Sequence, residues 1–140
     1  MRFLLDTNVL SEVTRTSPDQ GVLEWLDALD EDMAFISVVS IAEIRRGIVL
    51  LDHGRRRDAL VEWLSGDLLE RFEQRVLPVD QTVALCWGGL MGEAKRLGRG
   101  LSSMDGLIGA TAITNDLVLA TRNIKDFEAH QIHLHNPWLL

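Results

Sequence analysis

Short apolar runs alternate along the chain with longer segments of helical pattern. Each run has the length of a strand, and the runs fall at 2–5, 34–36, 76–79 and 117–120. Parallel strands need long crossover connections, usually helices, so this alternation predicts an α/β fold. We expect a single three-layer domain with a mainly parallel central sheet that is flanked by helices.

Capping residues indicate where several helices begin. Ser40, with Glu43 three residues later, is the expected cap of a helix that runs through Leu51. Asp80 is expected to cap a long helix that runs through Leu97. The other expected elements are helices over 8–14, from 19 to 29, over 55–72, from 102 or 103 to 115 and over 123–129, and an edge strand over 132–134.

Three glycines interrupt the helix expected after Asp80. They are Gly88, Gly89 and Gly92, and no glycine-rich phosphate loop follows a strand there. We expect close packing against a neighbouring helix to explain them.

The length and composition fit one compact domain, expected over residues 1–140. The chain has 140 residues, of which 46% are hydrophobic. Cys86 is the only cysteine, so no disulfide can form within the chain and a reducing compartment is expected. The start MRFLLDTN lacks the apolar region of a signal peptide, and no segment approaches the ~20 apolar residues of a membrane helix. We therefore expect a cytoplasmic protein that makes no membrane contact.

The net charge argues at first against a nucleic-acid ligand. The chain carries 21 acids against 14 bases, a formal charge of −7, whereas phosphate contacts require lysine and arginine. Two interpretations are open. Either nucleic acid is not the ligand, or some acids form a metal site while the bases cluster elsewhere.

Three acids lie where a parallel sheet places its ligand site, beyond the carboxyl ends of the strands. Asp6 follows the first apolar run directly, Glu43 stands among apolar residues, and Asp105 falls in the first turn of an expected helix. Each has an ordinary explanation, such as a helix cap for Asp6 or a favourable dipole interaction for Asp105. Their convergence on one rim favours a common site.

Converging carboxylates repel one another and raise one another's pKa unless a cation neutralises them. Oxygen ligands suit Mg²⁺ or Mn²⁺, and no set of cysteines and histidines indicates zinc. This interpretation resolves the charge question in favour of a metal site with bases grouped elsewhere.

Four segments together resemble the motif regions of PIN-domain nucleases. They are LLDTNVLSE, SIAEIRRGI, SSMDGLIGATA and LVLATRNIKDF, in that order, and the likeness covers essentially the whole chain. The chain is most similar to the toxin component of the VapC and FitB type. The resemblance implies a PIN-like domain whose metal-binding and catalytic acids are Asp6, Glu43 and Asp105.

The resemblance has one departure. A fourth acid in this family usually follows a threonine–arginine pair, and here Thr121 and Arg122 are followed by Asn123. The resemblance implies that Asn123 occupies the catalytic position, although an amide brings no charge. Asp126, three residues further on, is the alternative fourth ligand.

The resemblance implies hydrolysis of RNA phosphodiesters by a site that holds Mg²⁺, for which Mn²⁺ could substitute. Thr7, Asn8 and Thr121 are expected to orient the carboxylates and the phosphate, with ordinary capping as the alternative. Arg46 and Arg122 are the expected phosphate contacts, whereas the arginines over 55–57 suit a solvated helix face.

The resemblance also implies two protein partners. We expect a homodimer, and a cognate antitoxin that blocks the acidic site. Apolar residues over 9–13 and 44–51 exceed what a small core needs and are the expected contact surfaces.

Three alternative functions make different demands on the sequence. A receiver-like phosphoacceptor module would need an acidic pair before the end of the first strand and a later lysine at the end of a strand, and the sequence has neither. A phosphatase with an aspartate nucleophile would need a second aspartate where Asn8 stands. A PIN-like module that binds an antitoxin or nucleic acid without cleavage stays open, because Asn123 weakens the acid set.

Overall fold

A five-stranded, entirely parallel sheet forms the centre of the computed structural model, which describes residues 1–139. The strand order is β3-β2-β1-β4-β5. The expected α/β fold with a parallel sheet is therefore confirmed. The strands are β1 (Phe3–Leu5), β2 (Ala34–Ser37), β3 (Val76–Leu77), β4 (Val118–Ala120) and β5 (Leu134–His135).

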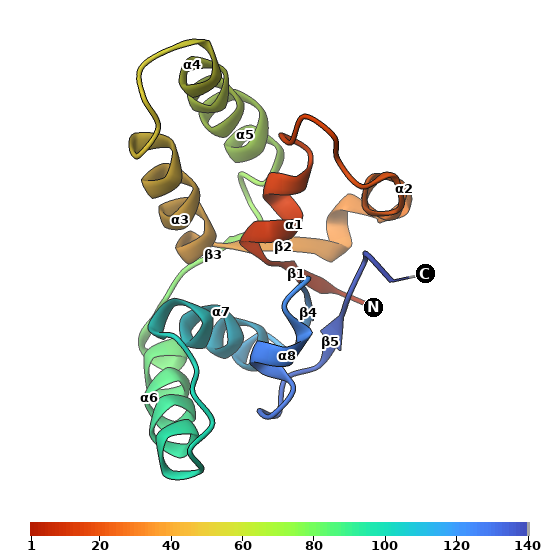
Figure 1. The fold of residues 1–140 in the computed structure, drawn as a ribbon. Coiled ribbons are helices and arrows are strands. Elements are labelled where there is room, and N and C mark those ends of the chain that lie inside the picture. The colour runs from red at the N-terminus through yellow and green to blue at the C-terminus, as the bar shows by residue number, and fades with distance from the viewer. Residues whose placement is uncertain (140) are drawn as a thin grey trace.

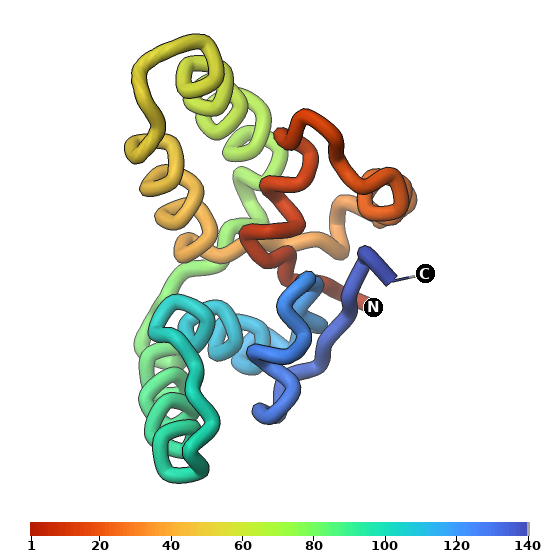
Figure 2. Tube along the Cα trace, in the orientation of Figure 1, coloured from red at the N-terminus to blue at the C-terminus, as the bar shows by residue number. Residues whose placement is uncertain are grey.

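Helices cover both faces of the sheet (Figure 1). The helices from α1 to α5 lie on one side, and α6 and α7 lie on the other. The chain passes from the first layer to the second between α5 and α6 (Figure 2). The helical elements are α1 (Thr7–Glu12), α2 (Gln20–Ala28), η1 (Glu31–Met33), α3 (Val38–Val49), α4 (Arg55–Glu62), η2 (Trp63–Leu68), α5 (Leu69–Arg71), α6 (Gln81–Arg96), α7 (Ser103–Thr114) and α8 (Ile124–Phe127).

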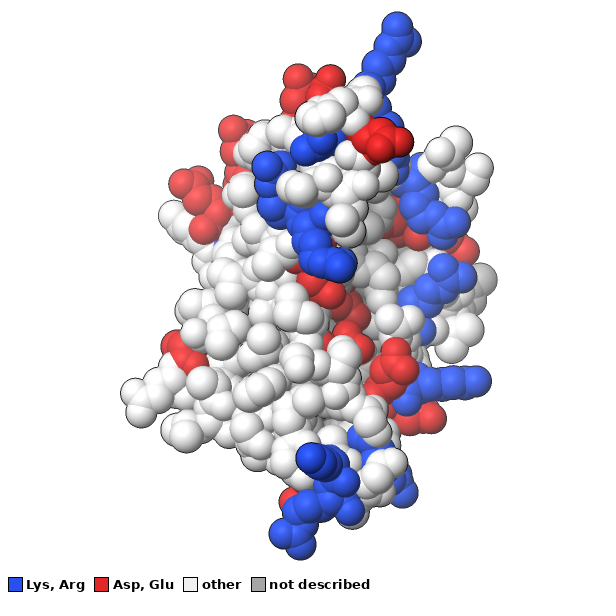
Figure 3. All heavy atoms as spheres, turned by 60° about the vertical axis from the view of Figure 1, so that its left-hand side comes forward, with Lys and Arg blue, Asp and Glu red and all other residues white. Residues whose placement is uncertain are grey.

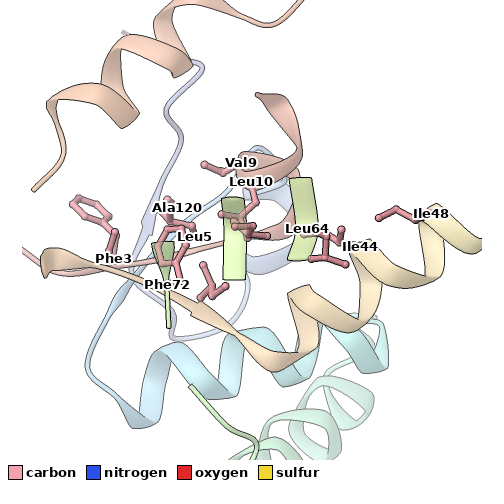
Figure 4. Close-up of a cluster of buried hydrophobic side chains, with 12 residues drawn as sticks. Phe3, Leu5, Val9, Leu10, Ile44, Ile48, Leu64, Phe72 and Ala120 are labelled. Atoms are coloured by element: carbon pink, nitrogen blue, oxygen red, sulfur yellow. The ribbon is translucent and has the colours of Figure 1, made fainter. Parts of the chain in front are cut away.

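The central strand β1 is buried on both faces, which explains its uninterrupted apolar sequence. Phe3 and Leu5 point to one face and pack with Ile44 and Phe72 in the cluster drawn in Figure 4. Leu4 points to the other face and packs in a second cluster that contains Ile108, Leu119 and Phe127. A polar residue can therefore enter the strand only at its end, where Asp6 lies.

Most expected helices form, but one cap is a different serine. Ser37, which ends β2, accepts a hydrogen bond from the Val39 N–H and caps α3, whereas Ser40 lies fully buried within that helix. The expectation for Ser40 was wrong because strand β2 leads into α3 without a connecting loop, and the cap must have the extended backbone that Ser37 has.

Two other segments differ from expectation. The helical run over 55–72 forms, but residues 63–68 make a π-helical turn in its middle. The last strand is Leu134–His135 rather than 132–134, because Ile132 is buried in the second core cluster ahead of the strand. Within residues 1–139, no helix combines the length and the hydropathy needed to cross a membrane.

The glycines of α6 are not explained by packing within the chain. A Cβ atom at Gly88, Gly89 or Gly92 would have nothing within 4 Å, so the expected close helix contact was wrong. The tight contact comes from α7 instead. A Cβ atom at Gly106 would lie 2.5 Å from the Met91 sulfur, and one at Gly109 would lie 2.8 Å from an Ile132 methyl group.

Candidate active site

Asp6 lies at the carboxyl end of β1 and caps α1. Its side chain is only 3% exposed and accepts hydrogen bonds on both oxygens. The Thr7 N–H donates to Oδ1 at 2.7 Å, the Thr121 hydroxyl donates to Oδ2 at 2.7 Å, and the Asn8 amide lies 3.4 Å from Oδ2. The carboxylate is thus fixed from α1 and from the neighbouring strand β4.

A hydrogen-bond network around Thr121 joins the loop after β4 to α1. The Thr121 N–H donates to the His135 carbonyl at 2.9 Å, which fixes its place at the end of β4. Its hydroxyl oxygen accepts from the Asn123 N–H at 3.0 Å, and the Asn8 amide lies 3.4 Å away. Asn8 in turn accepts from the Arg122 N–H at 3.2 Å. The motif residues of the first and last segments therefore form one unit.

Glu43 reaches the site from α3 and is held by hydroxyl groups. Thr7 Oγ1 lies 2.7 Å from Glu43 Oε1 and 3.0 Å from Ser40 Oγ. A hydroxyl has one proton. When Thr7 donates it to the carboxylate, Ser40, which is fully buried, must donate its own proton to Thr7. The order of donation is then Ser40 to Thr7 to Glu43.

Asp105 lies in the first turn of α7, as the sequence predicted. Ser102 caps this helix and accepts from the Asp105 N–H at 3.2 Å. Partial burial raises the pKa of the Asp105 carboxyl, the hydrogen bond from Ser102 lowers it, and the charge of Asp126 raises it again. Asp126, in α8, therefore lies within electrostatic reach of Asp105.

The acids form one electrostatic cluster. The pKa of Asp6 is raised to about 6, mainly by burial and to a smaller extent by the charges of Asp105 and Glu43, while the hydrogen bonds from Thr121 and Thr7 oppose the rise. A carboxylate desolvated beside two others is costly when ionised. A bound cation would remove that cost.

The donor chemistry of this cluster fits a hard divalent cation, because every ionisable group in it is a carboxylate. Within residues 1–139, however, no three acidic, histidine or cysteine side chains stand close enough to enclose an ion. The side chains as placed form an open site, which any metal would have to draw together.

The remaining predicted residues lie at the rim. Arg46 is exposed in the last turn of α3, one turn beyond Glu43. Arg122 is exposed, and its guanidinium lies 5.3 Å from the centre of the Trp138 ring. Asn123 is exposed, and it joins the network through its backbone N–H rather than through its side chain.

Sequence reasoning missed Ser40 as a site residue. One signal was present, since Ser40 lies three residues before Glu43 and therefore on the same side of a helix. The same serine also fits the pattern of a helix cap with Glu43 three residues later, and the sequence does not distinguish the two roles.

The fold and the site together define a class of protein. It is an α/β domain with a parallel sheet and an acidic site at the carboxyl ends of the strands. Residues 3–131 match the family described as PIN domain, and the chain belongs to that family.

Full-length relatives agree with this assignment. The chain is 37% identical to VapC ribonuclease Y4jK of Sinorhizobium fredii, with 96% of each protein covered. It is 38% identical to toxin FitB of Neisseria gonorrhoeae, with coverage of 96% of this chain and 97% of FitB. The crystal structure of FitAcB from Neisseria gonorrhoeae superposes with a TM-score of 0.93 at 38% identity and covers 99% of each chain.

Proposed function

We propose that this protein is the toxin of a type II toxin–antitoxin system and acts as a metal-dependent endoribonuclease, a hydrolase of phosphodiester bonds. The observation that carries the proposal is that Thr7 joins two acids from separate elements, because its N–H donates to Asp6 and its hydroxyl donates to Glu43, while Asp105 lies within electrostatic reach of Asp6. Relatives named as a ribonuclease and as a toxin, at 37% and 38% identity, support it. An RNA substrate implies a site of action in the cytoplasm.

The proposed nuclease is a single PIN domain, because all five strands belong to one sheet. Asp6 and Asp105 would hold Mg²⁺, or Mn²⁺ in its place, with Glu43 direct or through water. When bound, such a cation lowers the pKa of a water molecule and stabilises the charge that develops on the phosphate.

The protein residues have separate roles in this mechanism. Thr121 and the Thr7 N–H fix the two oxygens of Asp6, and the Thr7 hydroxyl fixes one oxygen of Glu43. Asn8 keeps Thr121 in place relative to α1. Each carboxylate thus keeps its orientation when a ligand arrives, which reduces the reorganisation needed during the reaction.

Three further residues complete the proposal at the rim. Arg46 and Arg122 would contact the phosphates of the substrate. The position after Arg122 belongs to Asn123, whose amide oxygen could hold a metal-bound water but contributes no charge. Asp126 is the alternative, and the rise that its charge produces in the pKa of Asp105 supports a place near the metal.

A cognate antitoxin is the proposed protein partner. Solved structures similar to this chain include DNA-bound VapBC from Salmonella typhimurium, at 26% identity and a TM-score of 0.81. The chain offers an apolar hollow between α1, α2 and the α4–α5 segment that would suit an apolar segment of such a partner. Its lining includes Leu10, Val13, Leu26, Trp63 and Leu68.

Part of the expected surplus of apolar residues is buried within the monomer. Val9, Leu10, Ile44 and Ile48 are buried in the core. The apolar residues of segments 9–13 and 44–51 that remain exposed are Val13, Val49, Leu50 and Leu51. We propose a homodimer that uses the exposed apolar residues of α3 together with those of α6.

A module that binds without cleaving is the second candidate function, and Asn123 in place of an acid is the observation that favours it. One experiment separates the two. The purified protein is incubated with total RNA in Mg²⁺ or in excess EDTA, alongside Asp6→Asn, and the cut ends are mapped. Cleavage that depends on Mg²⁺ and on Asp6 supports the nuclease. Undiminished cutting in EDTA, or by the variant, would contradict it.

A further inference from the structure

Among residues 1–139, some lysine and arginine side chains make ion pairs, hydrogen bonds or ring contacts with other residues, and others do not. Arg15 and Arg71 make ion pairs, Arg75 donates to backbone carbonyls, Arg2 donates to the Asn115 carbonyl, and Arg57 contacts His53. Arg122 stacks on Trp138. Among residues 1–139, the cations whose side chains have no such partner are Arg45, Arg46, Arg55, Arg56, Lys95, Arg96, Arg99 and Lys125.

All of these free cations except Lys125, which lies in α8, fall into two clusters. The upper cluster contains Arg45 and Arg46 at the end of α3 and Arg55 and Arg56 at the start of α4. The lower cluster contains Lys95 and Arg96 at the end of α6 and Arg99 just after it. Figure 3 shows basic side chains at the two ends of one face, with acidic side chains between them.

The α4 half of the upper cluster does not stabilise its own helix. Arg55 and Arg56 occupy the first turn of α4, whose cap Gly54 makes no side-chain hydrogen bond. The positive end of the helix dipole lies there, so cations are unfavourable at that position. A residue pattern that works against local stability is expected where a function requires it.

The lower cluster includes a cation that the helix dipole does not explain. Lys95 and Arg96 interact favourably with the end of α6, but Arg99 follows the helix. Lys95 and Arg99 line an open cleft of about 650 Å³ together with Gly98, Gly100 and Leu101. A volume of that size lies in the range of ligand-binding clefts.

The lower cluster lies a short distance from the acids. The first turn of α7, which carries Asp105, packs on α6 at Met91 and Trp87. Lys95 is one turn further along α6 than Met91, a rise of about 6 Å. Glu43 and Arg46 are likewise one turn apart on α3. An RNA strand centred on the acids would reach Arg46 on one side and Lys95 on the other within a few nucleotides.

We propose that RNA crosses this face of the molecule. Its cleaved phosphate lies at the acid cluster, and its backbone is held by the upper cluster on one side and by the lower cluster on the other. The inference rests on the proposed ribonuclease function and names the surface that function uses. With a net charge of −7, the protein as a whole repels RNA, so affinity must come from cations concentrated along the path.

The test measures RNA binding without cleavage. Asp6→Asn is the background, and the ligand is a 5′-labelled single-stranded RNA in Mg²⁺, titrated at several KCl concentrations. One variant adds Arg55→Gln and Arg56→Gln, and a second adds Lys95→Gln and Arg99→Gln. The control adds Arg2→Gln and Arg71→Gln, which remove the same charge at the opposite, amino-terminal edge of the sheet. Thermal melting confirms that each variant is folded.

We expect both cluster variants to weaken binding several-fold and to reduce the slope of log Kd against log salt by about 1.4, from two lost contacts of about 0.7 each. The control should bind like the background. Weakening by only one cluster, or by neither, would overturn the proposed path. A background protein that binds no RNA would instead contradict the proposed function itself.

Discussion

The Asp6 carboxyl is 3% exposed, and burial raises its pKa to about 6 from an ordinary value of 3.8. The folded protein therefore binds this proton more tightly than the unfolded chain does. The contribution of Asp6 to stability is most favourable below pH 4, declines as the pH rises from 3.8 to about 6, and stays low above that.

Asp6→Asn should consequently stabilise the metal-free fold at pH 7.5 by up to about 3 kcal/mol relative to wild type, because an amide cannot ionise. The gain should shrink to nothing near pH 4. Mg²⁺ should raise the melting temperature of wild type and leave that of the variant unchanged. Urea unfolding of both proteins from pH 4 to 8 measures this difference, and a gain that does not vary with pH would contradict the assignment.

Ser40 and Thr7 provide a second prediction at the residue scale. Ser40→Ala removes the donor behind Thr7, so Glu43 is held less firmly and the Mg²⁺ midpoint of cleavage should rise a few-fold. Ser40→Thr should restore it. Ser37→Ala is the matched control, since Ser37 is equally buried but caps α3.

The control should lose about 1 kcal/mol of stability through its missing cap and keep a normal Mg²⁺ midpoint. Isothermal titration of Mg²⁺ gives the same comparison without activity. Equal midpoints for Ser40→Ala and Ser37→Ala would show that Ser40 has only a packing role.

Asn123 and Asp126 compete for the fourth position of the site. Asn123→Asp adds a carboxylate and should tighten Mg²⁺ binding if the side chain faces the metal. It need not raise turnover, because tighter metal binding in the ground state does not by itself lower the barrier. Asp126→Asn should have little effect unless Asp126 has taken over the role. The rate of cleavage is measured against Mg²⁺ for both variants. An unchanged midpoint for the first, with a large shift for the second, would identify Asp126 as the fourth ligand.

The sequence was informative about the acids and less so about what holds them. Asp6 and Asp105 could be placed because each stands at the boundary of a strand or helix with a clear pattern. The partner of Glu43 could not, because the contact between Thr7 and Ser40 spans 33 residues and depends on how α1 packs against α3. Local patterns do not contain that information.

At the scale of elements, prediction was best where a cap and an apolar pattern agreed. Asp80 and Ser102 cap α6 and α7 at the expected places. Prediction was poorest where tertiary packing decides the outcome. In β5, for example, the strand starts beyond Ile132, because Ile132 is buried in the second core cluster. The π turn over Trp63–Leu68 also left no local signal.

The glycines of α6 allow a prediction at this scale. A Cβ atom at Gly88 or Gly92 would meet nothing, so alanine should stabilise the monomer by about 0.5–1 kcal/mol through reduced entropy of the unfolded chain. Chemical unfolding at low protein concentration measures this. A loss of stability in both variants would show that these positions approach something within the chain.

At the scale of the whole molecule, apolar and charged surfaces are separated. Figure 3 shows a broad uncharged area on the face that carries α3 and α6, beside the line of acids. Leu85 on α6 is 71% exposed, and Leu50 at the end of α3 is 68% exposed. Large apolar side chains in such an area favour a protein contact.

The proposed homodimer gives the last prediction. Leu85→Glu places a charge in the uncharged area, and burying it in an interface would be costly, so the variant should be monomeric. Leu139→Glu is the matched control, because Leu139 is 70% exposed but lies near the end of the chain. Light scattering at micromolar concentration should show a dimer for wild type and for the control, and a monomer for Leu85→Glu with an unchanged melting temperature at low concentration. A wild-type protein that stays monomeric, or a dimer that tolerates the glutamate at position 85, would exclude this face as the interface.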